Sequence, residues 1–425
     1  MKWGCLQPLT GGMYIGAEEA LGCQASWIIS YKGLDDFKMK NGEVASAGNE
    51  HNLMVYLHKN GRSITRSEFT HGMFEDKDIK DVKIINPVTS EETQPDFEDM
   101  DIVVGVPVCS GLSQATIAGS ETKSTRNCNM RFLADYALSK IRPKVYIFEN
   151  APGIVADRGD EIRADLESIA LRNGYSVAYY KTDTMLHGNC QKRPRTFILF
   201  QRWRDGKMST TSSMRFCDER ISPKEYLSKI HADATQQVPF KMSTLNEILI
   251  EYLRDKFGTG WRSVTGKTPM DYIVKHSLLD NLKEYVEDNT DGRDVKRMLK
   301  WLDHVKVKHE AGLNFYSMAA WTYNGDIATP SVQFKSLQSL LHHSEDRLLT
   351  VREALWLMGM PMDFELLGDP NTEGPKIGQN VPVGTAKFIV SEAKRWIEEW
   401  DNPKERTDRS RNVSFYDNTK KQQFY

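Results

Sequence analysis

The stretch Val103-Val104-Gly105-Val106-Pro107-Val108-Cys109-Ser110-Gly111-Leu112-Ser113 decides the fold of this sequence. A β-branched run ends in glycine, proline and small residues, so the sequence predicts a buried strand that leads into a loop able to approach a ligand closely. That loop carries the thiol of Cys109. Two other segments, Phe148-Glu149-Asn150 and Gln191-Lys192-Arg193-Pro194-Arg195, follow or begin similar short runs. We therefore expect a thiol, a carboxylate and two guanidinium groups at neighbouring strand ends of one sheet.

The first half of the chain alternates short apolar runs with helical patterns. This alternation over residues 1–203 predicts an α/β fold, with a doubly wound parallel sheet covered on both faces. Helical spacing over 131–141 ends before Arg142-Pro143, because the residue before a proline avoids helical angles. Ligands of such sheets gather at the carboxyl ends of the strands. The predicted strands are residues 3–6, 27–31, 102–106, 145–148 and 196–200.

The character of the sequence changes at about residue 204. Serine and threonine cluster at 209–213, and helical patterns follow at 245–257, capped by Ser243 or Thr244, and at 293–308. We expect a separate, smaller domain at 204–316. Residues 317–400 would then return to complete the first domain, and 401–425 would form a flexible tail. The helix at 293–308 is rich in Lys and Arg outside its apolar stripe, which fits either a merely solvated face or contact with phosphates.

Composition sets the broad class of the protein. The chain has 425 residues, of which 40% are hydrophobic and 27% charged, as in ordinary globular proteins. Its net charge of −2 does not indicate a nucleic-acid partner, although residues 181–204 are locally basic. Six cysteines without Cys-x-x-Cys or suitable His spacing predict no metal site and a reducing compartment. We expect an intracellular monomer without a membrane span or signal peptide, cytoplasmic if it is bacterial or phage-encoded.

The three strand-end segments carry residue types that suit chemistry on a pyrimidine. Carbon 5 of cytosine is a poor nucleophile, but a thiolate that adds at carbon 6 converts the ring to an enamine, which can react at carbon 5. A carboxylic acid at ring N3 would stabilise the charge that develops there. An arginine at O2 would hold the ring in register.

In order along the chain, these and further segments resemble the DNA cytosine-5 methyltransferase family. Gly11 to Glu18 resembles the end of its first cofactor motif, and Cys109 matches its nucleophile. Glu149-Asn150 matches its Glu-Asn-Val element. Gln191, Arg193 and Arg195 match its Gln-x-Arg-x-Arg element. Downstream, 347–353 with 359–364 resembles the ninth motif, and 378–383 resembles the tenth.

The resemblance implies a Rossmann-like methyltransferase fold that uses S-adenosylmethionine and acts on double-stranded DNA, with 204–316 as the target-recognition domain. Glu149 would protonate or hydrogen-bond N3, and Arg195 would hold O2. Arg193 would lie near the active loop or a phosphate, or in a structural ion pair. Ser110, Ser113 and Gln191 would contact DNA around a cytosine flipped from the duplex. The residues expected to bind the donor are Gly11, Gly12, Pro107, Asn380 and Val381.

Departures from the family pattern cluster on the cofactor side. Gln7 stands at the usual aromatic position, Leu9 at the usual first glycine, and Val108 replaces the proline before the cysteine. Either the donor is a variant of S-adenosylmethionine, or the chain has drifted and Leu9 is accommodated by a shifted turn. The acid that holds the ribose remains open among Asp35, Asp36 and Glu50.

Three other functions stay open from the sequence. They are an RNA cytosine methyltransferase, a catalytically silent DNA-binding module and, more remotely, a nicotinamide-dependent oxidoreductase. The separate domain favours duplex DNA over RNA, because reading base edges in a major groove needs extra surface. A restriction-modification system is one setting that such an enzyme would fit.

Overall fold

The computed structural model describes residues 1–31, 49–73, 75–108, 112, 128–204, 214–258, 269–290, 292–312, 329–330, 332, 340–345, 347–401 and 413–420. Its centre is a nine-stranded sheet. From one edge to the other, the strands are β11 (Val413–Asp417), β7 (Tyr175–Asp183), β9 (Pro194–Arg202), β6 (Val145–Asn150), β5 (Ile102–Gly105), β1 (Trp3–Leu6), β2 (Ile28–Tyr31), β3 (Arg66–Phe69) and β4 (Ile84–Ile85). A second pair joins β8 (Gln191–Lys192) to β10 (Thr329–Pro330).

The five predicted strands are confirmed as β1, β2, β5, β6 and β9. The sheet is mixed, however, and not wholly parallel. Strands β6, β5, β1, β2 and β3 run parallel to one another, whereas β4 is antiparallel to β3, and β9 is antiparallel to both β6 and β7. Only residues 184–193 separate β7 from β9, and so short a link suits an antiparallel pair better than a crossover.

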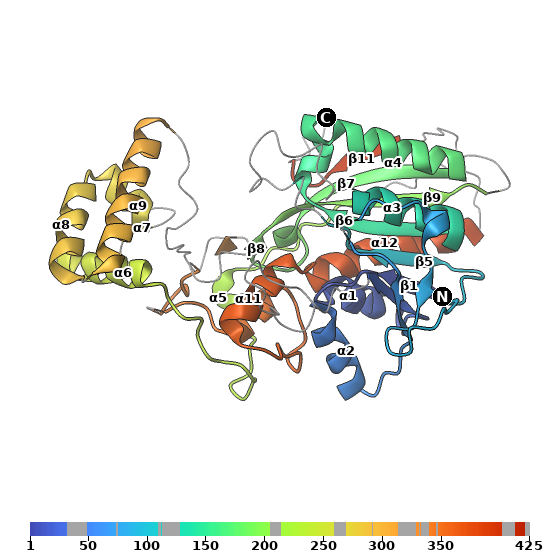
Figure 1. The fold of residues 1–425 in the computed structure, drawn as a ribbon, viewed down its shortest axis with the longest axis horizontal. Coiled ribbons are helices and arrows are strands. Elements are labelled where there is room, and N and C mark those ends of the chain that lie inside the picture. Colours follow the sequence, from blue (N-terminus) through green and yellow to red (C-terminus); the bar gives the residue numbers. More distant parts are fainter. Residues whose placement is uncertain are drawn as a thin grey trace.

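Helices cover both faces of the sheet (Figure 1). Helices α1 (Gly12–Leu21) and α12 (Val383–Asp401) pack on one face, and α3 (Cys128–Tyr136) and α4 (Asp160–Asn173) pack on the other. Alternate residues of each strand enter opposite cores: Trp3 and Cys5 join the α1 side, and Leu6 joins the α3 side. The predicted helix at 131–141 is thus α3, continued by a π-helical turn at Ala137–Ile141.

Four described helices of the expected second domain lie well apart from the sheet, at the left of Figure 1. They are α6 (Thr244–Phe257), α7 (Pro269–Lys275), α8 (Leu279–Asn289) and α9 (Arg293–Glu310). Of the two candidate caps, Ser243 is the N-cap of α6: its hydroxyl accepts a hydrogen bond from the Asn246 N–H at 3.4 Å.

The segment before α6 packs on the first domain instead. The Phe240 N–H donates to the Leu349 carbonyl at 3.0 Å, and the Tyr226 hydroxyl donates to the Trp356 carbonyl at 2.8 Å. The separate lobe therefore begins near residue 244 and not at 204. The remaining helices are α2 (Asn49–Lys59), α5 (Pro223–Leu227), α10 (Val351–Leu357) and α11 (Pro370–Gln379).

The last described residues differ from the flexible tail expected at 401–425. Residues 413–417 form β11, which pairs parallel to β7 in register from Val413 with Val177 to Asp417 with Lys181. The Phe415 ring stacks on the Tyr179 ring, with centroids 5.0 Å apart.

Candidate active site

The predicted carboxylate and one predicted guanidinium meet at the end of β6. Glu149 lies opposite Phe197 of the antiparallel neighbour β9, and Arg195 lies two residues before Phe197. The Arg195 Nε is 2.7 Å from the Glu149 Oε1. The Glu149 side chain is 5% exposed and the Arg195 side chain 19%. The ion pair is therefore almost covered, and its more open side is that of the arginine.

Burial raises the pKa of the Glu149 carboxyl above its ordinary value, although Arg195 and, more weakly, Arg193 lower it. Desolvation disfavours the carboxylate more than the two guanidinium groups favour it. A carboxyl with a raised pKa retains a proton closer to neutral pH. It can therefore act as a hydrogen-bond donor or acid toward a ring nitrogen.

Cys109, Ser110 and Ser113 lie outside the described residues, so their predicted roles remain predictions. The chain that leads to Cys109 is described. Gly105 of β5 is the register partner of Phe148 in β6, so the two strands end side by side. Pro107 is buried, and the Val108 N–H donates to the Asn129 Oδ1 at 2.9 Å. The described chain therefore approaches position 109 from the strand next to the one that carries Glu149.

Arg193 lies in a different environment from Arg195, the other arginine of the motif. It is 2% exposed, and its guanidinium donates to the carbonyls of Val332, of Gly378 at 2.8 Å and of Asn380 at 3.0 Å. These partners are backbone groups of the returning chain. This arrangement favours a structural role over a phosphate contact.

Gln191 is fully buried, which does not support the expected contact with DNA. Its amide nitrogen donates to the Leu357 carbonyl at 2.9 Å, and its amide oxygen accepts from the Val332 N–H at 2.9 Å. Both backbone polar groups of Val332 are thus held, the N–H by Gln191 and the carbonyl by Arg193. Gln191 and Arg193 therefore hold the backbone at Val332, where the chain returns from the lobe to the first domain.

Sequence reasoning missed two side chains that support this motif. Asp183 is buried, and its Oδ1 accepts from the Arg193 N–H at 2.9 Å. Asn189 is also buried; its Oδ1 accepts from the Gln191 N–H at 2.8 Å, and its amide donates to the Leu357 carbonyl at 2.8 Å. Short Asp and Asn side chains commonly bond to backbone two residues on, as Asp183 does with Met185, and that tendency was the available signal.

The predicted donor-binding residues at the two ends of the chain come together. The Gly12 N–H donates to the Asn380 Oδ1 at 2.8 Å. A Cβ added at Gly12 would lie 1.9 Å from the Val381 carbonyl oxygen, so only glycine allows this approach. Gly11 is the N-cap of α1 with φ of 109° and has no side chain of its own to cap the helix, so the Asn380 amide oxygen accepts the first helical N–H instead. The start of α1 therefore abuts the junction between α11 and α12.

The two unusual residues before α1 both have left-handed backbone angles. Gln7 has φ of 50° and Leu9 has φ of 52°, a region that glycine occupies without strain. Leu9 therefore takes a conformation that suits the glycine which usually stands there, at a cost of about 1–2 kcal/mol. Gln7 is buried, and its amide nitrogen lies 3.3 Å from the Met73 sulfur.

Of the three candidate ribose acids, only Glu50 lies among the described residues. Glu50 is 1% exposed, it accepts a hydrogen bond from the Ser30 hydroxyl, and Arg66 approaches it at 3.7 Å. These contacts with β2 and β3 favour a structural role. Asp35 and Asp36 lie outside the described residues.

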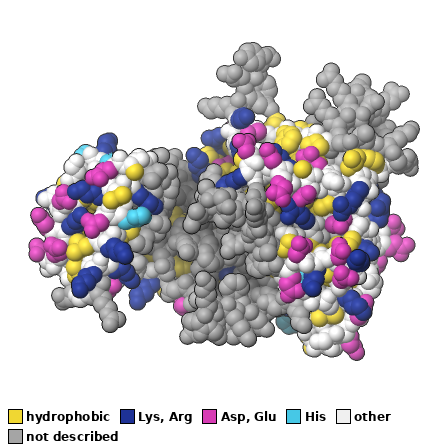
Figure 2. Space-filling model, turned by 45° about the horizontal axis from the view of Figure 1, so that its top comes forward, with side chains coloured by type: hydrophobic (Ala, Val, Ile, Leu, Met, Phe, Trp, Pro, Cys, Tyr) yellow, Lys and Arg dark blue, Asp and Glu magenta, His cyan; other side chains and the backbone are white. Residues whose placement is uncertain are grey.

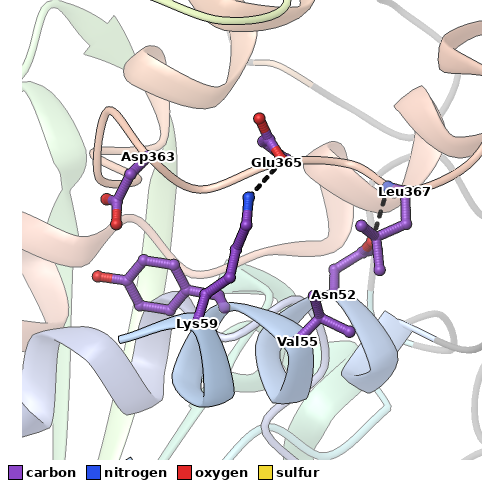
Figure 3. A pocket seen from close by; sticks show the side chains of 7 residues that line it. Asn52, Val55, Lys59, Asp363, Glu365 and Leu367 are labelled. Carbon is purple, nitrogen blue, oxygen red and sulfur yellow. Dashed lines mark hydrogen bonds and ion pairs between the residues drawn. The ribbon is translucent and has the colours of Figure 1, made fainter. Parts of the chain in front are cut away.

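A small pocket between α2 and residues 363–367 contains none of the predicted site residues (Figure 3). There Lys59 pairs with Glu365 at 2.8 Å, and the Asn52 Oδ1 accepts from the Leu367 N–H at 3.0 Å. These contacts brace α2 against the returning chain. In the described part of the chain, no group of His, Cys, Asp or Glu is arranged to hold a metal ion. None of its helices has the length and apolar character needed to cross a bilayer.

Comparison with known proteins gives one family. The model of C-5 cytosine-specific DNA methylases matches residues 66–395, a range that includes Cys109, Glu149 and Arg195 but not Gly11 and Gly12. A Methanocaldococcus jannaschii protein provisionally named type II methyltransferase M.MJ0563P is 23% identical over 328 residues, which are 75% of this chain and 85% of that protein.

A plant relative is much longer than this chain. DNA (cytosine-5)-methyltransferase 1A of Oryza sativa is 22% identical over 344 residues, which are 71% of this chain but 22% of that protein. Among solved structures, the Entamoeba histolytica methyltransferase EhMeth superposes with a TM-score of 0.52 at 9% identity, over 95% of this chain and 99% of that chain. At this identity, the superposition shows a shared fold.

Proposed function

Because this chain belongs to the C-5 cytosine-specific DNA methylase family and is a DNA (cytosine-5)-methyltransferase, we propose that Cys109, Glu149 and Arg195 carry its chemistry. The observation that carries this assignment is the buried Glu149–Arg195 pair, at 2.7 Å, at the end of β6. The strand that leads toward Cys109 ends beside it.

In this mechanism, Arg195 and Glu149 hold the edge of the cytosine ring. A guanidinium has five N–H donors, so Arg195 can hold Glu149 and the Pro194 carbonyl, at 2.7 Å, and still donate to O2 of the base. The protonated Glu149 carboxyl donates to N3. Together these contacts stabilise the electron density that moves onto N3 when a nucleophile adds to carbon 6.

The Cys109 thiolate forms a bond to carbon 6, and the electrons of the carbon 5–carbon 6 double bond become available at carbon 5. Carbon 5 then takes the methyl group. A base removes the proton from carbon 5, the double bond forms again, and the Cys109 thiolate leaves. The proton shared with N3 returns to the Glu149 carboxylate as N3 loses its added electron density.

S-adenosylmethionine, which the family and the fold imply, supplies an electrophilic methyl group when it is bound. The described residues fit this donor, because α1 begins at a glycine N-cap and has no acidic residue in its first turn, and such a terminus suits a carboxylate. Gly12, Asn380 and Val381 fix the position of that terminus.

We assign unmodified S-adenosylmethionine as the donor and not a variant of it. The left-handed angle of Leu9 supports this, because the backbone there adopts a conformation open to the usual glycine. Calorimetry with the folded protein checks the assignment. The absence of measurable S-adenosylmethionine binding would contradict it.

The proposed substrate is a cytosine flipped out of duplex DNA, with the lobe of α6–α9 providing surface beyond the catalytic part. The proposed location is intracellular. This is supported by the free cysteines Cys5, Cys23 and Cys217 among the described residues, which suit a reducing compartment.

A covalent trap tests the mechanism. Duplex DNA containing 5-fluorocytosine should form an adduct with the protein that survives denaturation, because fluorine at carbon 5 cannot be removed as a proton is. Cys109→Ser should abolish the adduct, and Cys23→Ser, at a half-buried free cysteine, should not. Continued methylation by Cys109→Ser would refute the nucleophile. A wild-type protein that binds DNA and donor without forming an adduct would instead be a silent DNA-binding module.

A further inference from the structure

One face of α9 carries unpaired positive charge along its length. Lys296, Lys300, His304 and Lys308 follow one another at intervals of four residues, so they lie along one side of the helix; we call them the α9 stripe. Lys296, Lys300 and His304 are exposed, and Lys308 is half-buried. The opposite side of α9 is buried in the lobe through Met298, Trp301, Leu302 and Val305.

Two of the three acidic side chains of α9 form ion pairs, and the third, Glu310, is exposed at the end of the helix beyond the stripe. Asp303 pairs with Lys283 of α8 at 2.6 Å, and Asp294 pairs with Arg297 at 3.3 Å. The lysine of α9 nearest α8, Lys306, approaches Asp280 at 3.5 Å. Among the ion pairs of the described residues, none uses Lys296, Lys300 or Lys308. Pairing thus neutralises one side of α9 and leaves the other cationic.

The position of the stripe suits a ligand shared with the catalytic part. Along the long axis of the molecule, α8 is outermost and α9 stands between α8 and the sheet (Figure 1). Figure 2 shows Lys and Arg side chains on the surface of this lobe, interspersed with Asp and Glu. The stripe lies on the side of α9 opposite its buried contacts.

The stripe also has the dimensions of a backbone contact. Twelve residues separate Lys296 from Lys308, which is about 18 Å of helix at 1.5 Å per residue. One strand of duplex DNA carries a phosphate about every 3.4 Å of its axis, so the stripe spans roughly five phosphates. On the described part of α9, the exposed large apolar side chain is Val307, which is too little to anchor the helix in a membrane.

We propose that the α9 stripe binds the sugar-phosphate backbone of the duplex DNA on which the enzyme acts. The inference rests on the proposed function, since it takes duplex DNA as the substrate. Contacts with phosphates position a protein without reading sequence. The stripe therefore contributes affinity and orientation, and residues elsewhere select the site.

The test is the salt dependence of duplex binding by the full chain. We compare wild type with Lys296→Gln/Lys300→Gln/Lys308→Gln on a 30-base-pair duplex without its recognition sequence. Glutamine retains helix propensity, so circular dichroism should be unchanged. If the three lysines each contact a phosphate, the slope of log affinity against log salt should decrease by about 2.7, because each phosphate contact contributes about 0.9.

The matched control is Lys80→Gln/Lys83→Gln/Lys140→Gln, which removes the same charge from exposed positions of the catalytic part. It should keep the wild-type slope. An unchanged slope and affinity in the α9 variant would overturn the inference, and so would an equal loss in the control. Tighter binding of the wild type to anionic lipid vesicles than to the duplex, removed by the same substitutions, would also overturn it.

Failure of this inference can be distinguished from failure of the proposed function. At low salt and saturating DNA, the α9 variant should still form the covalent adduct through Cys109. Normal adduct formation with an unchanged salt slope would reject the stripe alone. Absence of the adduct in wild type would reject the proposed mechanism. The salt dependence of duplex binding would still test the α9 stripe independently.

Discussion

At the scale of single residues, Glu149 shows how burial prepares a carboxyl for catalysis. The sequence predicted its place at the end of a buried strand, with Arg195 at a neighbouring strand end, but it did not predict the ion pair between them. The structure adds that burial outweighs the nearby guanidinium groups and raises the pKa of Glu149. No pattern in the sequence could give that balance, because it depends on which atoms surround the carboxyl.

Glu149→Gln should lower kcat by about 100-fold or more, because the amide can donate a hydrogen bond to N3 but cannot transfer a proton. Wild-type kcat should fall as pH rises through the raised pKa of Glu149, since the protonated form is the active one. The variant should lose that alkaline decline. A pH–rate profile under saturating substrate checks both outcomes.

The same substitution has a signature in stability. As pH rises, the Glu149 carboxyl ionises at a lower pH in the unfolded chain than in the folded protein, because its pKa is raised on folding. Between these two pKa values, the free energy of unfolding of the wild type therefore falls relative to that of the variant. Below and above this pH range, the difference in unfolding free energy between wild type and variant should not change with pH. Thermal melts from pH 4 to 8 test this, with Glu287→Gln at an exposed position as the control. A pH-independent difference would contradict the raised pKa.

At the scale of elements, short apolar runs predicted the strands that carry the site, because central strands are buried on both faces and rich in β-branched residues. The helices α4 and α12 and the strands β7 and β11 were not predicted. For β11, the stabilising partner is β7, more than two hundred residues earlier in the chain. The role of Gln191 was likewise hidden, because its partners Leu357 and Val332 come from distant segments.

Gln191→Leu should destabilise the attachment of the returning chain. The substitution keeps a buried side chain but removes the partner of the Val332 N–H, at a cost of about 1–3 kcal/mol, whereas the Leu357 carbonyl keeps its hydrogen bond from Asn189. The Val332 amide should exchange hydrogen faster than in wild type. Gln24→Leu, where an exposed amide donates to the Ser63 carbonyl, is the control and should change little. Unaltered exchange at Val332 would contradict the fastening role.

At the scale of the whole molecule, the predicted division into a sheet domain and a second domain resembles the observed arrangement, with its boundary displaced. Residues 214–240 lie on the first domain because Phe240 and Tyr226 bond to Leu349 and Trp356. Composition could mark a change of character near 204. It could not reveal which domain the next residues contact.

Removal of residues 413–425 should lower the free energy of unfolding by roughly 2 kcal/mol, because Tyr179 loses the stacked ring of Phe415 and β7 loses its ladder partner. It should also promote aggregation, since β7 would become an uncovered edge. Urea denaturation and light scattering measure the two effects. Removal of 421–425 alone should leave β11 in place and change neither quantity. Equal stability of the two truncated proteins would show that β11 contributes nothing.

The contact between α1 and α12 has a consequence for synthesis in the cell. A Cβ added at Gly16 would lie 2.6 Å from that of Ala386, and Lys387 pairs with Glu19 at 3.1 Å. Helix α1 thus waits for α12, which is synthesised much later, and its apolar side stays uncovered in the interval. Nascent chains halted before residue 383 should therefore depend on chaperones, and folding should be slow even in the finished polypeptide.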